Sequence, residues 1–253
     1  MNRIWRLWLA LGLVLVASFA VLLFYGRELA LKAPPIPGRV VTDSGQLLLT
    51  HDDILDGQNV WQSIGGMQLG SIWGHGSYIA PDWSADWLHR ECLWLLERWS
   101  QQHYRRPYRE LEPAQQAILQ HEMRCNRYDA DRDTLTISDD RAQAFRALSI
   151  YYACIFGQAE TFPEEIAFLA DGRRFPAALR EAYAMPPNTV ADPERMRKLC
   201  AFIFWTAWAC VAERPHSQEI LHGPTQTTLS SGVSYTNNWP AEPLVNNRPT
   251  GQA

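Results

Sequence analysis

The sequence predicts a mainly α protein, with one N-terminal transmembrane helix followed by a helical domain outside the membrane. Its first 30 residues contain a long run without a charged side chain. Several later segments repeat apolar residues at the three-to-four-residue spacing of a helix. A second span is not expected, because the best later candidate, Leu199–Ala212, has only 14 residues and suits a buried helix better.

The anchor is predicted from the 19 residues Leu7–Tyr25. A helix rises about 1.5 Å per residue, so this run matches a hydrocarbon layer of about 30 Å. The run continues into Arg27 instead of ending at a small-residue cleavage site, which favours an uncleaved anchor over the alternative, a secretory signal peptide. Basic residues nearly balance on its two sides. The short stretch before the run favours an N-terminus inside the cell, with everything after Gly26 outside.

The elements that follow the anchor are predicted from prolines, glycines and apolar periodicity. Three prolines in Ala33–Gly38 indicate a stiff spacer. We expect an extended segment or short strand in Val40–Leu49, a helix from near Thr50 to the Gly65-Gly66 pair, and a loop over Gly65–Ser77.

The rest of the domain is predicted to be mainly helical up to residue 215. The expected elements are a helix capped by Ser84 and striped by Leu88, Cys92, Leu95 and Trp99; a helix from Pro113 to about Arg124; an extended run Thr134–Ile137; a helix opened by Ser138 and Asp139; and a helix opened by Asp192-Pro193 and ended by Pro215. Residues 216–253 show no clear periodicity.

Composition excludes several functions. The formal net charge is −4 and there is no lysine or arginine block, so nucleic acid is not expected as a partner. No G-x-S-x-G, P-loop or dinucleotide-binding motif occurs. We therefore assign no residue to catalysis.

The cysteines and histidines do not indicate a metal site. No two cysteines have the C-x-x-C spacing, and no two histidines share a helix face at i, i+3 or i+4. Cys92, Cys154, Cys200 and Cys210 lie in apolar helical stretches, where we expect small buried side chains; a disulfide stays open. The run His89-Arg90-Glu91 is expected to form a solvated helix face.

The segment Trp61–Trp87 is unusually rich in tryptophan and glycine. Glycine permits close approach of the backbone and aromatic rings fill space, so the segment could be a former cofactor pocket, a docking face or a core loop. The candidate residues for a packed loop or interface are Trp61, Trp73, His75, Tyr78, Trp83 and Trp87.

Four runs carry a resemblance to a known family. They are GQNVWQSIGGMQLGSIWGHGSYIAPDWSADWLHRE (57–91), EMRCNRYD (122–129), DPERMRKLCAFIFWTAWA (192–209) and YTNNWPAEPLVNNRPTG (235–251). They resemble the N-terminal anchor and extracytoplasmic cytochrome c-like domain of the quinol-dependent nitric oxide reductases, over nearly the whole chain. The resemblance implies an anchor over residues 1–32, a cytochrome c-like domain over 33–215, and an irregular tail over 216–253 that leads toward a catalytic transmembrane bundle.

The resemblance also implies what the complete enzyme does. Enzymes of this family reduce two molecules of nitric oxide to nitrous oxide and water with electrons from quinol. Their haem b, high-spin haem and non-haem iron lie in the transmembrane bundle, which follows the region that resembles this chain. We expect no cofactor in this chain, which reads as a fragment of a longer protein or as an interrupted gene.

Comparison with the cytochrome c subunit of related enzymes points to a lost haem c site. Its C-x-x-C-H motif falls on Gly66, Leu69 and Gly70, which supply neither thioether sulfurs nor an imidazole. Met185 matches the axial methionine as a possible remnant. We expect Trp73 and neighbouring aromatic side chains to fill the vacated pocket, and Trp73→Ala to destabilise the domain by about 3 to 5 kcal/mol if the ring lies in the core.

Two functional hypotheses follow. In the first, the chain is the N-terminal part of a quinol-dependent nitric oxide reductase in the bacterial inner membrane, with a haem-free periplasmic domain that caps the catalytic bundle. Its partners would be that bundle and membrane lipid, with quinol bound only by the missing part. In the second, it is a free-standing, membrane-anchored periplasmic interaction module without a catalytic role.

Overall fold

The computed structural model of the chain describes residues 3–76, 81–172, 175–215 and 230–236. The chain divides into two compact units, Met1–Pro35 and Ile36–Ala253. Each unit has its own internal contacts.

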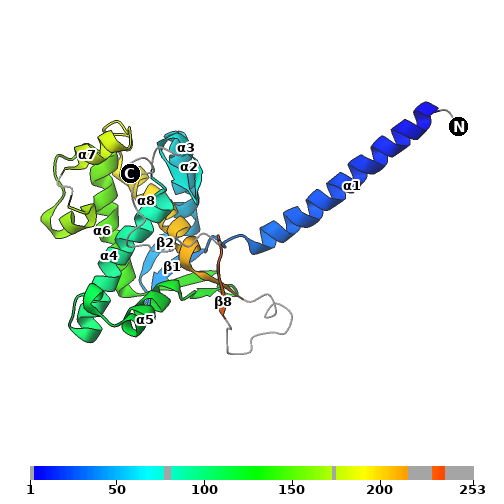
Figure 1. The fold of residues 1–253 in the computed structure, drawn as a ribbon. Helices are drawn as coiled ribbons and strands as arrows, with labels where there is room; N and C mark the ends of the chain where they lie inside the picture. Colours follow the sequence, from blue (N-terminus) through cyan, green and yellow to red (C-terminus); the bar gives the residue numbers. More distant parts are fainter. Residues whose placement is uncertain (1–2, 77–80, 173–174, 216–229, 237–253) are drawn as a thin grey trace. The chain divides into compact units, whose positions relative to one another are not determined.

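The first unit is a single helix, α1 (Arg3–Lys32) (Figure 1). Its segment Ile4–Ala30 has a mean hydropathy of 2.7, and its large apolar side chains are exposed. Exposed apolar side chains on all faces suit a helix that is surrounded by lipid. By length and composition α1 can cross a membrane, which confirms the prediction of one N-terminal membrane-spanning helix. No second helix of this kind occurs among the residues that the structure describes.

Four long helices form the core of the second unit, which confirms a mainly α domain (Figure 1). They are α2 (His51–Ser63), α4 (Trp83–Tyr104), α6 (Asp139–Phe156) and α8 (Pro193–Val211). Every residue from Leu199 to Ala212 is buried, because α2, α4 and α6 all pack against α8. A helix that is apolar on all sides needs such an environment.

A glycine sets the distance between α2 and α8. A Cβ atom on Gly57 would lie 1.9 Å from the carbonyl oxygen of Lys198 and 2.8 Å from the Cβ of Phe202. Because the first neighbour is backbone, no side chain can move aside for it. The two helices therefore touch at a point that only glycine allows.

A small sheet completes the core, with strand order β2-β1-β6-β5. The strands are β1 (Arg39–Thr42), β2 (Leu47–Thr50), β5 (Tyr128–Asp129) and β6 (Thr134–Ile137). β1 pairs antiparallel with β2 and parallel with β6. The expectation of extended structure in Val40–Leu49 and Thr134–Ile137 is confirmed.

Short elements connect these parts. They are α3 (Gly66–Leu69), β3 (Ser71–Ile72), β4 (His75–Gly76), the 3₁₀ helix η1 (Tyr108–Glu110), α5 (Pro113–Arg124), the 3₁₀ helix η2 (Glu164–Ala170), α7 (Pro176–Ala182), β7 (Glu213–Pro215) and β8 (Ser230–Ser234).

Several helix ends follow the predicted capping signals. The Thr50 hydroxyl accepts from Asp53 N in a capping box, Ser138 accepts from Arg141 N, and Asp192 accepts from Glu194 N. Each cap satisfies a backbone donor that the first helical turn leaves unpaired.

Other boundaries were predicted wrongly. The cap of α4 is Asp82 rather than Ser84, because its carboxylate accepts from Ala85 N and the helix begins at Trp83. α8 ends at Val211, before Pro215. The expected loop from Gly65 contains α3 and a two-stranded hairpin. Strand β8 lies within residues 216–253, most of which are outside the described part of the chain.

Candidate functional site

The glycine- and tryptophan-rich segment folds around the side chain of Asp82. Its carboxylate accepts hydrogen bonds from Ser71 Oγ at 2.8 Å, Gly74 N at 2.6 Å and Ala85 N at 3.0 Å. It thus joins the β3–β4 hairpin to the first turn of α4. The hairpin turns at Trp73 and Gly74, which both have positive φ. This geometry makes the segment a packed part of the domain.

Trp83 lies at the centre of this segment and is fully buried. Its ring contacts Trp61, Tyr152, Phe156 and Tyr183, with centroids 5.0–6.5 Å apart. Its indole nitrogen has no hydrogen-bond partner among the described residues. Trp83 therefore fills the space between α2, α6 and the end of α7 with a large apolar side chain.

Two of the three residues that the sequence comparison aligns with a haem-binding motif are glycines, and tryptophan rings occupy the space beside them. A Cβ on Gly70 would lie 2.2 Å from Nε1 of Trp83, and a Cβ on Gly66 would lie 2.2 Å from the ring of Trp61. Gly66 is buried, whereas Leu69, the third position, is half-buried. No larger side chain fits at 66 or 70 unless these rings move.

The other candidate residues have different environments. Trp73 is half-buried, donates from Nε1 to the carbonyl oxygen of Thr206 at 2.9 Å, and packs beside Trp205. Trp87 is fully buried and stacks on Tyr152 at 5.2 Å. His75 is exposed in β4, and Tyr78 lies outside the described residues.

Met185 is buried in the same core. It follows Ala184, which has a positive φ, and its backbone nitrogen donates to the carbonyl oxygen of Arg180 at 2.8 Å. Tyr183, two residues earlier, contacts the ring of Trp83. Met185 is thus a packed side chain of the hydrophobic core, in the turn after α7.

The run His89-Arg90-Glu91 is buried, so the prediction of a solvated face was wrong. Arg90 makes a two-pronged ion pair with Asp86 at 2.9 and 3.0 Å, donates to Leu169 O, and lies 4.2 Å over the ring of Tyr151. Adjacent charges can be buried together because α6, α8 and η2 all pack on α4. Burial is tolerated because each charge has a partner.

Two partners in this network have shifted pKa values. Burial would lower the pKa of Arg90, but the charge of Asp86 holds it well above its ordinary value. Burial would raise the pKa of Asp171, but a hydrogen bond with His89 at 3.0 Å and the nearby charges hold it below its ordinary value. Asp86 also accepts from the Tyr152 hydroxyl. Arg90 and Asp171 therefore keep their charges at neutral pH, and the network ties α4 to α6 and to the end of η2.

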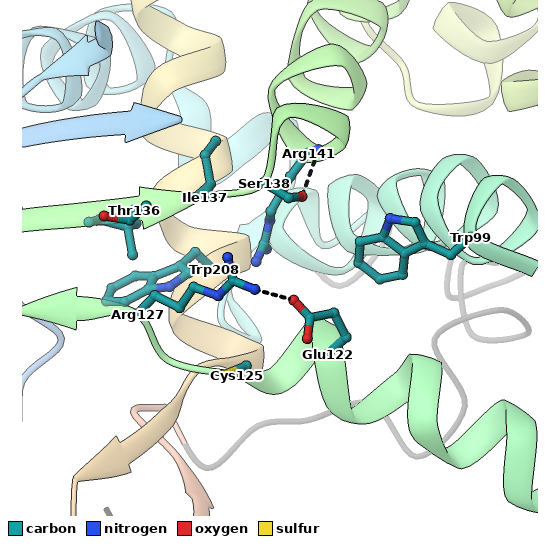
Figure 2. Close-up of a pocket in the computed structure, with 10 residues that line it drawn as sticks. Trp99, Glu122, Cys125, Arg127, Thr136, Ile137, Ser138, Arg141 and Trp208 are labelled. Atoms are coloured by element: carbon teal, nitrogen blue, oxygen red, sulfur yellow. Dashed lines mark hydrogen bonds and ion pairs between the residues drawn. The ribbon is translucent and has the colours of Figure 1, made fainter. Parts of the chain in front are cut away.

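A second buried ion pair borders a small cavity, whose lining, including Arg141, is shown in Figure 2. Glu91 and Arg141 interact at 2.7 and 3.2 Å. Arg141 also lines a cavity of about 20 Å³ together with Trp208, Ser138 and the Glu122–Arg127 ion pair. A space of this size and polarity suits about one water molecule.

Comparison with known proteins now adds to this geometry. A family model for the cytochrome c-like domain of NorB, a component of nitric oxide reductase, matches residues 37–241. The chain belongs to this family. Membership in it implies a complex with a catalytic membrane subunit, and α1 indicates a membrane-anchored protein. A comparison with curated proteins found no match.

The family's name implies a haem c, so the haem positions can be tested against the structure. Covalent attachment needs two thiols and an imidazole. Gly66, Leu69 and Gly70 provide none of these, and the contacts of Gly66 and Gly70 leave no room for a Cβ. These residues do not fit a covalently bound haem.

Among the described residues, no group of three His, Cys, Asp or Glu side chains could hold a metal ion. None of the five cysteines forms a disulfide bond, and Cys92, Cys154, Cys200 and Cys210 are buried, as predicted. Burial raises the pKa of both Cys200 and Cys210 to about 12, so neither is a nucleophile at neutral pH.

Sequence reasoning did not identify the pairing of Arg90 with Asp86 or of Arg141 with Glu91. The first pair has an i, i+4 spacing that could have been noticed. The second joins residues 50 positions apart, for which a single sequence holds no signal.

Proposed function

We propose that the chain is the N-terminal part of a quinol-dependent nitric oxide reductase of denitrification, and that its second unit is a haem-free domain that caps the catalytic bundle. It would lie on the periplasmic side of the bacterial inner membrane. Haem b, high-spin haem and non-haem iron would be bound by the catalytic part, which would also contact quinol. No residue of this chain is assigned to the reaction.

One observation carries the haem-free role: Trp83 and Trp61 occupy the space beside the two glycines where haem-binding side chains would have to be. A domain that bound haem would need this volume for the porphyrin and its ligands. Here aromatic rings supply the buried apolar surface instead, with Trp83 in contact with four other rings. These ring contacts support a fold that needs no cofactor for its stability.

The haem-free role is tested by an absorption spectrum and a covalent haem stain of the full chain, purified from cells that mature c-type cytochromes. We expect neither a Soret band that survives denaturation nor a stained band. Either signal would contradict the proposal.

The capping role is tested by reading the gene downstream of codon 253. About a dozen further apolar spans in frame, each about 20 residues long, would support a catalytic bundle in the same protein. A stop codon with no such spans nearby would favour the free-standing interaction module instead.

A further inference from the structure

Three neighbouring arginines at the end of α4 are exposed and form no ion pair within the described part of the chain. α4 ends at Tyr104, Arg105 follows with a φ of 55°, and Arg106 and Arg109 lie on the turn that enters η1. By contrast, most arginines elsewhere in the domain pair with carboxylates, as Arg98, Arg124, Arg127 and Arg197 do. The turn therefore presents three unpaired guanidinium groups within five residues.

Two of the nearby carboxylates are occupied by other donors, and a third, Glu110, is exposed in the same turn. Glu97 accepts from Tyr108 N at 3.0 Å and from Gln101 Nε2 at 3.0 Å. Glu112 takes part in the capping box of α5. The Ser100 hydroxyl donates to the carbonyl oxygen of Arg106. These contacts fix the backbone of the turn without using an arginine side chain, so the three guanidinium groups remain available.

An apolar pocket adjoins the arginines. It has a volume of about 120 Å³ and is lined by Cys92, Leu93, Leu96, Glu97, Pro107, Tyr108 and Arg109. A pocket of this size holds a short aliphatic segment. Cationic groups beside an apolar pocket suit a ligand with an anionic head and an aliphatic part.

We propose that the turn Arg105–Arg109 binds the anionic phospholipid headgroups of the membrane that α1 spans. Guanidinium groups bind phosphate oxygens through paired hydrogen bonds. The membrane is the source of phosphate, because only Ala33–Pro35 separate α1 from the second unit and the short connection keeps this unit at a high local concentration of lipid headgroups. The contact would hold the second unit at the lipid surface. This inference rests on the membrane anchor and is independent of the haem-free role.

The test uses the full chain in lipid nanodiscs of two compositions, zwitterionic phosphatidylcholine alone and phosphatidylcholine with about one third phosphatidylglycerol. Hydrogen exchange of residues 103–112 reports the contact. The variant R105Q/R106Q/R109Q removes the three charges at exposed positions, and R132Q/R146Q/R195Q is its control, with three exposed arginines removed elsewhere. Each arginine near an anionic surface strengthens binding by about fivefold, so three should have a large effect.

We expect slower exchange in the anionic nanodiscs only, reversed by about 0.5 M salt because screening weakens the attraction. The triple variant should lose this protection and the control should keep it. Equal exchange in both lipids would overturn the proposal. Protection that persists in zwitterionic lipid or in high salt would also overturn it, and would point to a protein contact. Loss of protection in the control variant would indicate a general charge effect and would equally contradict a specific turn.

Discussion

Trp83 is the side chain whose removal most directly tests the packing of the glycine- and tryptophan-rich segment. It is fully buried and contacts four aromatic rings. Burial of a whole indole removes about 200 Å² from water, which stabilises the fold by about 5 kcal/mol at 25 cal/mol per Å². Its N–H has no acceptor among the described residues, and that lost hydrogen bond costs the native state about 1–3 kcal/mol.

Trp83→Ala should therefore lower the free energy of unfolding by about 3 kcal/mol, in the lower part of the usual range for this substitution. The assay is guanidinium unfolding of the full chain in detergent, followed by near-ultraviolet circular dichroism. Added indole should restore part of the lost stability, because an apolar cavity can bind a small aromatic molecule.

Trp83→Phe is the matched control. It keeps most of the ring volume and removes the unpaired N–H, so we expect a loss below about 1.5 kcal/mol. If Trp83→Ala costs less than about 1 kcal/mol, Trp83 does not hold the core together. If Trp83→Phe costs as much as Trp83→Ala, the indole N–H makes a stabilising hydrogen bond, which would contradict its lack of a partner among the described residues.

Three further predictions follow from other contacts. Gly57→Ala should destabilise the domain by about 1–3 kcal/mol in the same unfolding assay, because its Cβ would meet the Lys198 carbonyl at 1.9 Å. Gln58→Ala is the control, which should not change the unfolding midpoint. If Gly57→Ala also leaves the midpoint unchanged, α2 and α8 can separate freely. Asp171→Asn should cost about 1 kcal/mol at pH 7 by weakening the contact with His89. Because the folded pKa of Asp171 is lowered, this difference should be present above about pH 4 and vanish as the pH falls through the folded pKa; a pH-independent difference between urea unfolding curves would argue against the pair. A maleimide reagent should label exposed Cys125 first in the native full chain, and a Cys125→Ser variant should stay unlabelled until it is denatured. Labelling is measured by mass spectrometry. Fast labelling of the native variant would contradict the burial of the other four thiols.

Much of the fold could be predicted because its signals are local. Helix caps at Thr50, Ser138 and Asp192 depend on a side chain and a backbone donor two or three residues away. The α1 segment depends only on a continuous apolar run. The start of α4 was misplaced because Ser84 and Asp82 are both good caps, and the hairpin contacts of Asp82 favour the latter.

The sequence by itself determined the membrane helix, the helical character of the domain and the absence of haem-binding side chains at positions 66, 69 and 70, because each depends on residue types or on neighbours within one turn. Only the tertiary structure decided which side chains are inside. α4 buries consecutive charged residues because several elements cover it, and Arg141 finds Glu91 from a distant part of the chain. Of the tryptophans that were candidates for a packed loop, Trp83 makes the aromatic contacts at the centre and Trp73 is half-buried, because burial depends on which surfaces meet, and a linear pattern does not encode that meeting.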